Sequence, residues 1–251
     1  MDLKALLSLA EDAARKAGDE ILKIYESGDF SIESKSDNSP LTRADRASHE
    51  AIVKELDQTD IPILSEEGRD IPYSERKAWE YFWMIDPLDG TKEFIKKNGE
   101  FTVNIALIKD GQPILGVVYP PVLDQMYTAI AGEGSRLDGS PIRSTQKSLE
   151  ESDLRVVASR SHMSDETQEF VDKLQNPEIV SKGSSLKLLM VASGEADVYP
   201  RFGPTMEWDT AAAHVIVTEA GGSVMRTNLQ EPVRYNKEDL LNPFFVVLSY
   251  Q

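Results

Sequence analysis

The chain has 251 residues, of which 40% are hydrophobic, and a formal net charge of −16 with a pI near 4.6. So acidic a surface repels the phosphate backbone of nucleic acid, which excludes a nucleic-acid polymer as an expected partner. No apolar run approaches the roughly 18 residues of a membrane span, and acidic residues come too early for a signal peptide. We expect a cytoplasmic monomer or weak dimer without stable membrane insertion, and peripheral association with the inner membrane stays open.

The first two predicted elements are amphipathic helices. Apolar residues at three- and four-residue steps predict a helix from Leu3 to about Gly28, and a second helix begins near Thr42. Each has one apolar face, so both are expected to pack on a sheet.

Next comes a run of strand-like segments. The apolar stretch 81–85 leads into Asp86-Pro87-Leu88-Asp89-Gly90-Thr91, where proline and glycine predict a strand-to-helix turn. Three segments then predict an antiparallel meander, at 101–108, 113–119 and 125–130.

The pattern changes after a polar stretch, and we place the division between two halves near 136–152. The prediction is an N-terminal α+β half, 1–140, and a C-terminal α/β half, 141–251. In the second half we expect helices at about 165–174, 185–192 and 208–219, and strands at 154–159, 196–199, 223–225 and 244–249.

Several acidic residues are candidates for a metal site. Because the chain has no cysteine, a bound metal must be held by oxygen or by one of three histidines, which favours a hard cation such as Mg²⁺. The turn after Asp86 can direct its carboxylate, that of Asp89 and the Leu88 carbonyl to one side. The helix that opens at Gly90 and Thr91 would offer free N–H groups to a phosphate. The alternative is a simple turn with Asp89 as N-cap.

Two further acids could reach the same cluster. Glu66 follows the strand-like segment 61–64, and Asp209 stands at the start of an alanine-rich helix. Their alternatives are a solvated turn for Glu66 and an N-cap for Asp209.

Asp45 also has two interpretations. Thr42 and Asp45 match a capping box, which would satisfy the first N–H groups of their helix. The same carboxylate could accept a hydrogen bond from Thr91, whose oxygen could then take a proton from water.

Three separated motifs, in this order, resemble the inositol monophosphatase family: Glu66-Glu67, WMIDPLDGTKEF and WDTAAAHVIVTEAGG. The resemblance implies a layered α-β-α-β-α sandwich of the inositol monophosphatase and fructose-1,6-bisphosphatase type, built from two tightly joined halves. It also implies Mg²⁺-dependent, lithium-sensitive hydrolysis of phosphomonoesters in the cleft between them.

The resemblance assigns roles residue by residue. Two or three Mg²⁺ ions are implied, one of which activates water and is held by Glu66, Asp86 and the Leu88 carbonyl. Another, on the leaving-group side, is held by Asp86, Asp89 and Asp209. Asp45 and Thr91 match the water-activating pair, and the amides of Gly90 and Thr91 match the phosphate seat.

Within the family, the motif DPLDGTKEF is most similar to the corresponding motif of the bacterial 3′(2′),5′-bisphosphate nucleotidases. This similarity implies hydrolysis of 3′-phosphoadenosine 5′-phosphate to AMP and phosphate, in sulfur metabolism, with the sulfated nucleotide as a second substrate. The alternatives are an inositol or sugar phosphate monophosphatase and a non-catalytic nucleotide sensor.

The second half supplies the candidate substrate contacts. Lys187 and Arg201 are placed to receive a second phosphate, although single cations are often solvated surface groups. Ser159 and His162 follow a predicted strand and could line the nucleoside end of the cleft, with His162 as an exposed loop histidine in the alternative. Ser184 completes the expected substrate side.

Overall fold

The long apolar runs of the first half form a seven-stranded sheet. The computed structural model describes residues 1–31, 33–34, 40–68, 70–158 and 163–251. The strand order of this sheet follows the chain, and all pairs are antiparallel except the first, β3 with β4. Its strands are β3 (Ile63–Ser65), β4 (Tyr81–Asp89), β5 (Thr102–Lys109), β6 (Gln112–Tyr119), β7 (Tyr127–Ile130), β8 (Gly134–Leu137) and β9 (Ser140–Ile142).

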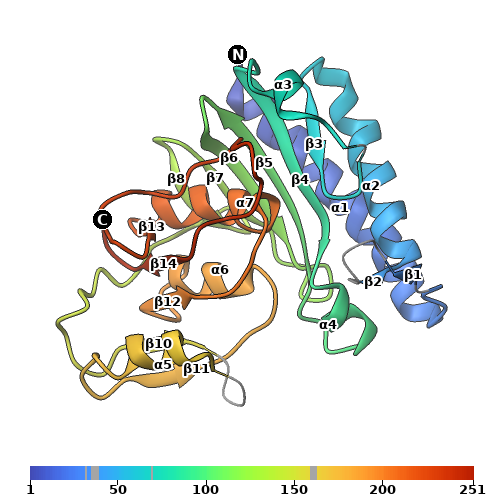
Figure 1. Ribbon diagram of the computed structural model, residues 1–251. Helices are drawn as coiled ribbons and strands as arrows, with labels where there is room; N and C mark the ends of the chain where they lie inside the picture. The colour runs from blue at the N-terminus through green and yellow to red at the C-terminus, as the bar shows by residue number, and fades with distance from the viewer. Residues whose placement is uncertain (32, 35–39, 69, 159–162) are drawn as a thin grey trace.

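Two helices cover one face of this sheet, as their apolar faces predict. Helix α1 (Leu3–Ser27) ends at Gly28, which adopts the left-handed conformation that glycine favours. Helix α2 (Arg43–Leu56) lies beside α1, and both pack on the sheet through one apolar cluster (Figure 1). The strands β1 (Glu33–Ser34) and β2 (Pro40–Leu41) form a small ribbon before α2, and a short helical turn, Asp57–Thr59, follows it.

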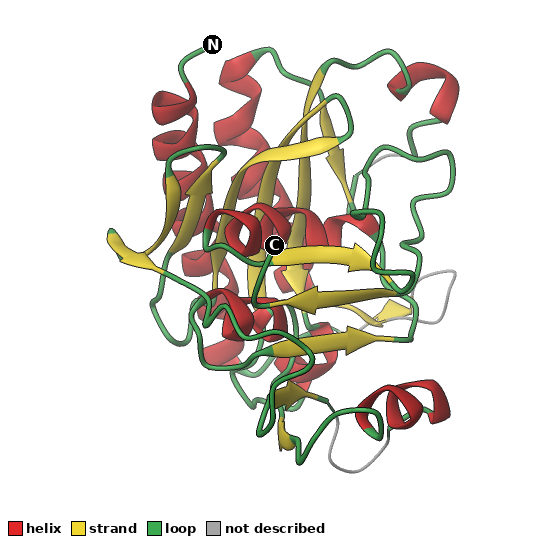
Figure 2. Cartoon of the chain, turned by 90° about the vertical axis from the view of Figure 1, so that its left-hand side faces the viewer, coloured by secondary structure: helices red, strands yellow, loops and turns green. Residues whose placement is uncertain are grey.

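The second half forms a five-stranded mixed sheet with the order β11-β10-β12-β14-β13. Helices α6 (Leu186–Ala192) and α7 (Glu207–Glu219) lie between the two sheets, and α5 (Asp165–Val171) packs on the outer face of the second (Figures 1 and 2). The layered sandwich is thereby confirmed. Its strands are β10 (Arg155–Val157), β11 (Glu178–Val180), β12 (Val198–Arg201), β13 (Ser223–Arg226) and β14 (Phe245–Leu248).

Two local predictions about the first half need correction. The segment from Asp86 to Asp89 is not a turn after a strand but the last part of β4, because both residues still pair with β5. The polar stretch near residue 140 contains the β8–β9 hairpin, so the first sheet extends across the predicted division. Its tight turn uses Asp138 and Gly139, both with positive φ, as two-residue hairpins require.

Most other elements lie where the patterns predict them. Sequence reasoning missed β11 and the short helix α3 (Tyr73–Arg76), and it ran α5 three residues too far. The helix predicted to open at Gly90 and Thr91 is confirmed as α4 (Thr91–Ile95). Helix α7 begins at Glu207, one residue before the predicted start. Within the described ranges, no helix combines the length and the apolar character needed to cross a membrane.

The buried carboxylate of Asp197 joins the segment after β9 to the second sheet. Asp197 precedes β12 and is 2% exposed. Its carboxylate accepts hydrogen bonds from the backbone N–H of Arg155 at 2.7 Å and from the guanidinium Nη2 of the same residue at 3.0 Å. It also accepts one from the hydroxyl of Thr145, in the segment after β9, at 2.7 Å. Burial opposes ionisation, but the bonds from Arg155 and Thr145 outweigh it and lower the pKa of Asp197 to about 2.

We predict that Asp197→Asn lowers the free energy of unfolding by about 2 to 3 kcal/mol at pH 7, since it removes charge-assisted hydrogen bonds. The folded pKa lies below the ordinary value of 3.8, so this contribution is complete above about pH 4 and is lost as the pH falls through about 2. Urea unfolding from pH 7 to pH 3 tests this, with the exposed Asp12→Asn as control. A difference that stayed constant over that range would contradict the assignment.

Candidate active site

Asp86 and Asp89 lie at the irregular end of β4. Each pairs with a residue of β5, and the register shifts between them, where Pro87 offers no N–H to the ladder. The Leu88 N–H donates to Asp86 Oδ1 at 3.1 Å, and Asp86 is 1% exposed. The bulge thus buries one carboxylate and leaves the other partly accessible.

Glu66 lies beside Asp86 because β3 runs parallel to β4. Ser65 is opposite Ile85, and the Glu66 N–H donates to the Ile85 carbonyl at 3.2 Å. Burial is the largest cause that raises the pKa of Asp86 well above its ordinary range, and the neighbouring acids add to it: Glu66, Asp89 and Asp209. Four acids from three segments are therefore neighbours: Glu66 after β3, Asp86 and Asp89 in β4, and Asp209 in α7.

Asp209 approaches from the opposite half, in the first turn of α7. The alternative of Asp209 as the N-cap is wrong in position, because Met206 is the N-cap and Asp209 is the third helical residue. Its Oδ2 accepts the Met206 N–H at 2.9 Å, as the third residue of a capping box does. Burial, then the charge of Asp89, raises the pKa of Asp209 to about 8, and Arg201 acts in the opposite direction. Asp209 therefore bonds the start of α7 and also lies close to the other acids of the site.

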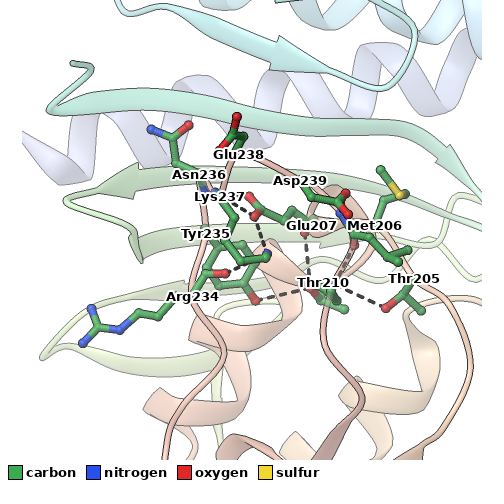
Figure 3. A network of polar contacts seen from close by, with 12 residues as sticks. Thr205, Met206, Glu207, Thr210, Arg234, Tyr235, Asn236, Lys237, Glu238 and Asp239 are labelled. Atoms are coloured by element: carbon green, nitrogen blue, oxygen red, sulfur yellow. Dashed lines mark hydrogen bonds and ion pairs between the residues drawn. The ribbon is translucent and has the colours of Figure 1, made fainter. Parts of the chain in front are cut away.

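A second buried acid fixes the start of α7. Glu207 is 0% exposed and accepts the Asn236 N–H at 2.5 Å, the Lys237 N–H at 3.0 Å and the Lys237 ammonium. Asn242 donates to the Met206 carbonyl at 2.8 Å. Figure 3 shows this network around the start of the helix. It holds the first turn of α7, and hence Asp209, against the segment that follows β13.

The donor chemistry suits a hard divalent cation. The four carboxylates and the Leu88 carbonyl offer only oxygen, which Mg²⁺ prefers. Burial and, after it, the neighbouring carboxylates raise the pKa values of Asp86 and Asp209, and a bound cation would favour the ionised acids. Among the described residues, no three or more acidic or histidine side chains already lie at the spacing of a closed metal site. The residues thus fit the ion by charge and ligand type.

Asp45 and Thr91 form the contact that the sequence suggested. Thr91 Oγ1 donates to Asp45 Oδ1 at 3.1 Å and lies 3.4 Å from the Leu88 carbonyl. The other oxygen, Asp45 Oδ2, accepts the Thr42 N–H at 2.7 Å and the Thr42 hydroxyl at 2.6 Å. Asp45 is therefore both a cap of α2 and the partner of Thr91.

Hydroxyl groups connect Asp89 to the second half. Asp89 Oδ2 accepts the Ser184 hydroxyl and the Ser185 N–H, each at 2.6 Å. Thr102 Oγ1 lies 2.8 Å from Ser184 Oγ and 2.7 Å from Ser185 Oγ. Sequence reasoning named Ser184 but missed Ser185 and Thr102. The one sequence signal for Ser185 is that it adjoins Ser184 before α6, and Thr102, at the start of β5, has none.

Two adjoining cavities open beside these acids. The smaller, about 170 Å³, is lined by Asp89, Gly90 and Asp209 among others; the larger, about 420 Å³, extends to Phe202 and Ser164. Three residues line both cavities: Lys187, Tyr199 and Arg201.

The cations between the cavities are only partly satisfied by the protein. Lys187 Nζ donates to the Ser184 carbonyl at 3.1 Å, and Arg201 Nη2 donates to the Pro204 carbonyl at 3.1 Å. The buried Arg201 Nε has no hydrogen-bond partner in the described part of the chain. A donor so placed is suited to an anion.

The structure gathers most of the predicted site residues, although their roles stay predictions. Ser159 and His162 lie outside the described residues. The candidates that line the cavities are Asp89, Gly90, Ser184, Lys187, Arg201 and Asp209. Glu66 and Asp86 are charge neighbours of these acids, Leu88 and Thr91 lie on either side of Asp89 and Gly90, and Asp45 bonds Thr91.

Comparison with known proteins gives consistent matches. The model of the inositol monophosphatase family matches residues 2–245. The 3′(2′),5′-bisphosphate nucleotidase CysQ of Escherichia coli O157:H7 is 47% identical over 245 residues, covering 94% of this chain and 97% of the relative. The CysQ of Salmonella typhimurium is 47% identical over 244 residues, with the same two coverages.

Solved structures of proteins from the same family superpose on this chain along nearly its whole length. The crystal structure of CysQ from Bacteroides thetaiotaomicron, a bacterial member of the inositol monophosphatase family, superposes with a TM-score of 0.86 at 46% identity and covers 98% of each chain. The inositol monophosphatase of Thermotoga maritima has a TM-score of 0.78 at 27% identity, covering 99% of this chain and 92% of that one.

We predict that Asp209→Asn raises the melting temperature in EDTA at pH 8, on the order of 5 °C. The folded pKa of about 8 exceeds the ordinary value of 3.8, so ionisation of Asp209 destabilises the fold as the pH rises between those values. Asparagine keeps an oxygen for the Met206 N–H.

Melting curves from pH 5 to pH 8 should show the advantage of the variant growing with pH, and saturating Mg²⁺ should stabilise wild type more than Asp209→Asn. A variant less stable than wild type in EDTA at pH 8 would contradict the repulsion argument.

Proposed function

This chain belongs to the inositol monophosphatase family, and on that basis we propose that it is a 3′(2′),5′-bisphosphate nucleotidase. Its preferred substrate is 3′-phosphoadenosine 5′-phosphate, which it hydrolyses to AMP and phosphate, and the sulfated nucleotide is a second candidate. The CysQ relatives support this reading, since they align along nearly the whole chain.

One observation carries the substrate assignment: Lys187 and Arg201 line both cavities. A substrate with its scissile phosphate beside the acids would place a second phosphate against these cations. The larger cavity, at about 420 Å³, then remains for the nucleoside, and Tyr199 and Phe202 in its wall offer aromatic surface.

The family is generally Mg²⁺-dependent, and we infer that this chain holds two or three Mg²⁺ ions and is inhibited by lithium. Glu66, Asp86 and the Leu88 carbonyl would hold one ion; Asp86, Asp89 and Asp209 would hold another. When bound, Mg²⁺ supplies Lewis-acid stabilisation of the charge that develops on the phosphate and on the leaving oxygen.

The residues of the chain move the proton. Thr91 donates to Asp45 at 3.1 Å, so a lone pair on Thr91 Oγ1 can accept a hydrogen bond from the attacking water. As the water oxygen bonds to phosphorus, its proton passes to Thr91 and the threonine proton passes to Asp45. The bond from phosphorus to the 3′ oxygen breaks, that oxygen takes a proton from solvent water to become a hydroxyl, and Asp45 returns its proton to solvent.

The amides of Gly90 and Thr91 are proposed to hold the phosphoryl oxygens. Gly90 has a φ of 97°, and a Cβ there would lie 3.1 Å from the Glu100 carbonyl. This left-handed residue lets the backbone turn sharply from β4 into α4, so its N–H can face the cavity.

We predict that Thr91→Ala lowers kcat about a hundredfold, because it removes the proton acceptor. Asp45→Asn should produce a similar loss, although asparagine can still cap α2. Steady-state kinetics with 3′-phosphoadenosine 5′-phosphate, together with melting temperatures, makes the test. Near-normal kcat in both variants would leave Asp45 with capping alone.

We predict that Arg201→Ala lowers kcat/KM for 3′-phosphoadenosine 5′-phosphate about tenfold to a hundredfold while sparing 3′-AMP, since a charge-assisted contact contributes about 1.5 to 3 kcal/mol. Phosphate release from both nucleotides and from inositol 1-phosphate measures this, with the exposed Arg136→Ala as control. Equal losses on all three substrates, or a wild-type preference for inositol 1-phosphate, would favour the monophosphatase alternative.

A further inference from the structure

One face of α2 contacts three segments of the proposed active site. Asp45, Ser48 and His49 are three and four residues apart, so they lie on the same side of the helix. Asp45 bonds Thr91, as described above. Ser48 and His49 have no part in the proposed reaction, yet each is directed at a segment that carries a proposed metal ligand.

Ser48 bonds the irregular end of β4. Its hydroxyl is fully buried and donates to the Pro87 carbonyl at 2.6 Å. A serine inside a helix commonly donates to the carbonyl four residues earlier, but this one reaches a strand 39 residues further along the chain.

The position of that bond matters because the ladder is interrupted there. Asp86 and Asp89 pair with β5, and the register shifts between them, so regular pairing does not fix the intervening peptides. Ser48 takes the Pro87 carbonyl toward α2, while the next carbonyl, that of Leu88, lies 3.4 Å from Thr91 Oγ1. With the Pro87 carbonyl bonded to Ser48, the Leu88 carbonyl is the one of the two that lies beside Thr91.

His49 bonds the turn that carries Glu66. Its Nδ1 lies 2.9 Å from Ser65 Oγ, and the same oxygen accepts the Glu67 N–H at 3.3 Å. The Ser65 carbonyl also accepts the Gly68 N–H at 3.1 Å, which closes the turn. Glu66 is therefore flanked by residues whose positions depend on Ser65 and, through it, on His49.

We propose that Ser48 and His49 are positioning residues that set the distance between the Glu66 turn and the Asp86–Asp89 bulge for cation binding. The inference rests on the proposed function for its metal ligands, but it assigns these two side chains a role of their own. A rigid helix that bonds both segments holds them in one register before any cation arrives.

The test measures Mg²⁺ binding directly, by isothermal titration calorimetry on the full chain. Ser48→Ala and His49→Leu should each weaken Mg²⁺ binding about tenfold, the lower range for residues that orient metal ligands. His49→Asn, which retains a polar atom near the position of Nδ1, should recover most of the affinity. Lys54→Gln, at an exposed position of α2, is the control and should bind as wild type.

Kinetics supply the second readout. We expect kcat at fixed, sub-saturating Mg²⁺ to fall in Ser48→Ala and His49→Leu, with KM for 3′-phosphoadenosine 5′-phosphate within about twofold of wild type, since neither residue lines the substrate cavities. Raising Mg²⁺ should restore much of the rate.

Unchanged Mg²⁺ affinity in Ser48→Ala and in His49→Leu, whatever happens to the melting temperature, would overturn the proposal and leave only a structural role. If His49→Leu fails to fold, Ser48→Ala and His49→Asn still decide it. A wild-type protein that binds Mg²⁺ but hydrolyses no bisphosphate nucleotide would refute the proposed function, and calorimetry would still judge the positioning role.

Discussion

The repulsion among buried carboxylates is the constraint on which the rest of this structure depends. Asp86 and Asp209 come from different halves of the chain, and both have raised pKa values because they are buried near other acids. A fold that holds such groups together without a cation must offset their mutual repulsion elsewhere. Hydrogen-bond donors offset the repulsion at each of three acids. Asp86 accepts the Leu88 N–H, Asp89 accepts the Ser184 hydroxyl and the Ser185 N–H, and Asp209 accepts the Met206 N–H.

The same constraint explains why the acids of the site come from different layers of the sandwich. The large sheet supplies Asp86 and Asp89, α2 bonds the first sheet from its outer side, and α7 brings Asp209 from the layer between the sheets. The Glu207 network fixes α7 at the end that carries Asp209. A site built in this way depends on the whole sandwich rather than on one loop.

The sequence predicted the elements that repeat a regular pattern. The apolar faces of α1 and α2, the meander of β5 to β7 and the acids of the three motifs could all be identified, because periodicity and local motifs determine them. The β8–β9 hairpin escaped notice because its strands are short and largely polar, and only Asp138-Gly139 marks its turn.

Contacts between distant segments could not be predicted. Nothing near Ser48 in the sequence indicates that its hydroxyl donates to the Pro87 carbonyl. Likewise, nothing near Ser185 indicates that its N–H donates to the Asp89 carboxylate. The orphaned Arg201 Nε likewise becomes visible only when β12 is placed beside the cavities. Such contacts depend on how the layers pack, whereas the single sequence reports what each segment prefers by itself.

The strand order of the second sheet bears on how the protein is made. β14 lies between β12 and β13, so residues 245–248 pair with strands synthesised well before them. β12 also pairs with β10, so without residues 245–248 it would lack a partner on one edge only, whereas β13 would lack its strand neighbour. The seven-stranded sheet pairs neighbours in chain order, whereas the second sheet needs pairs between segments far apart in the chain, whose closure costs more conformational entropy.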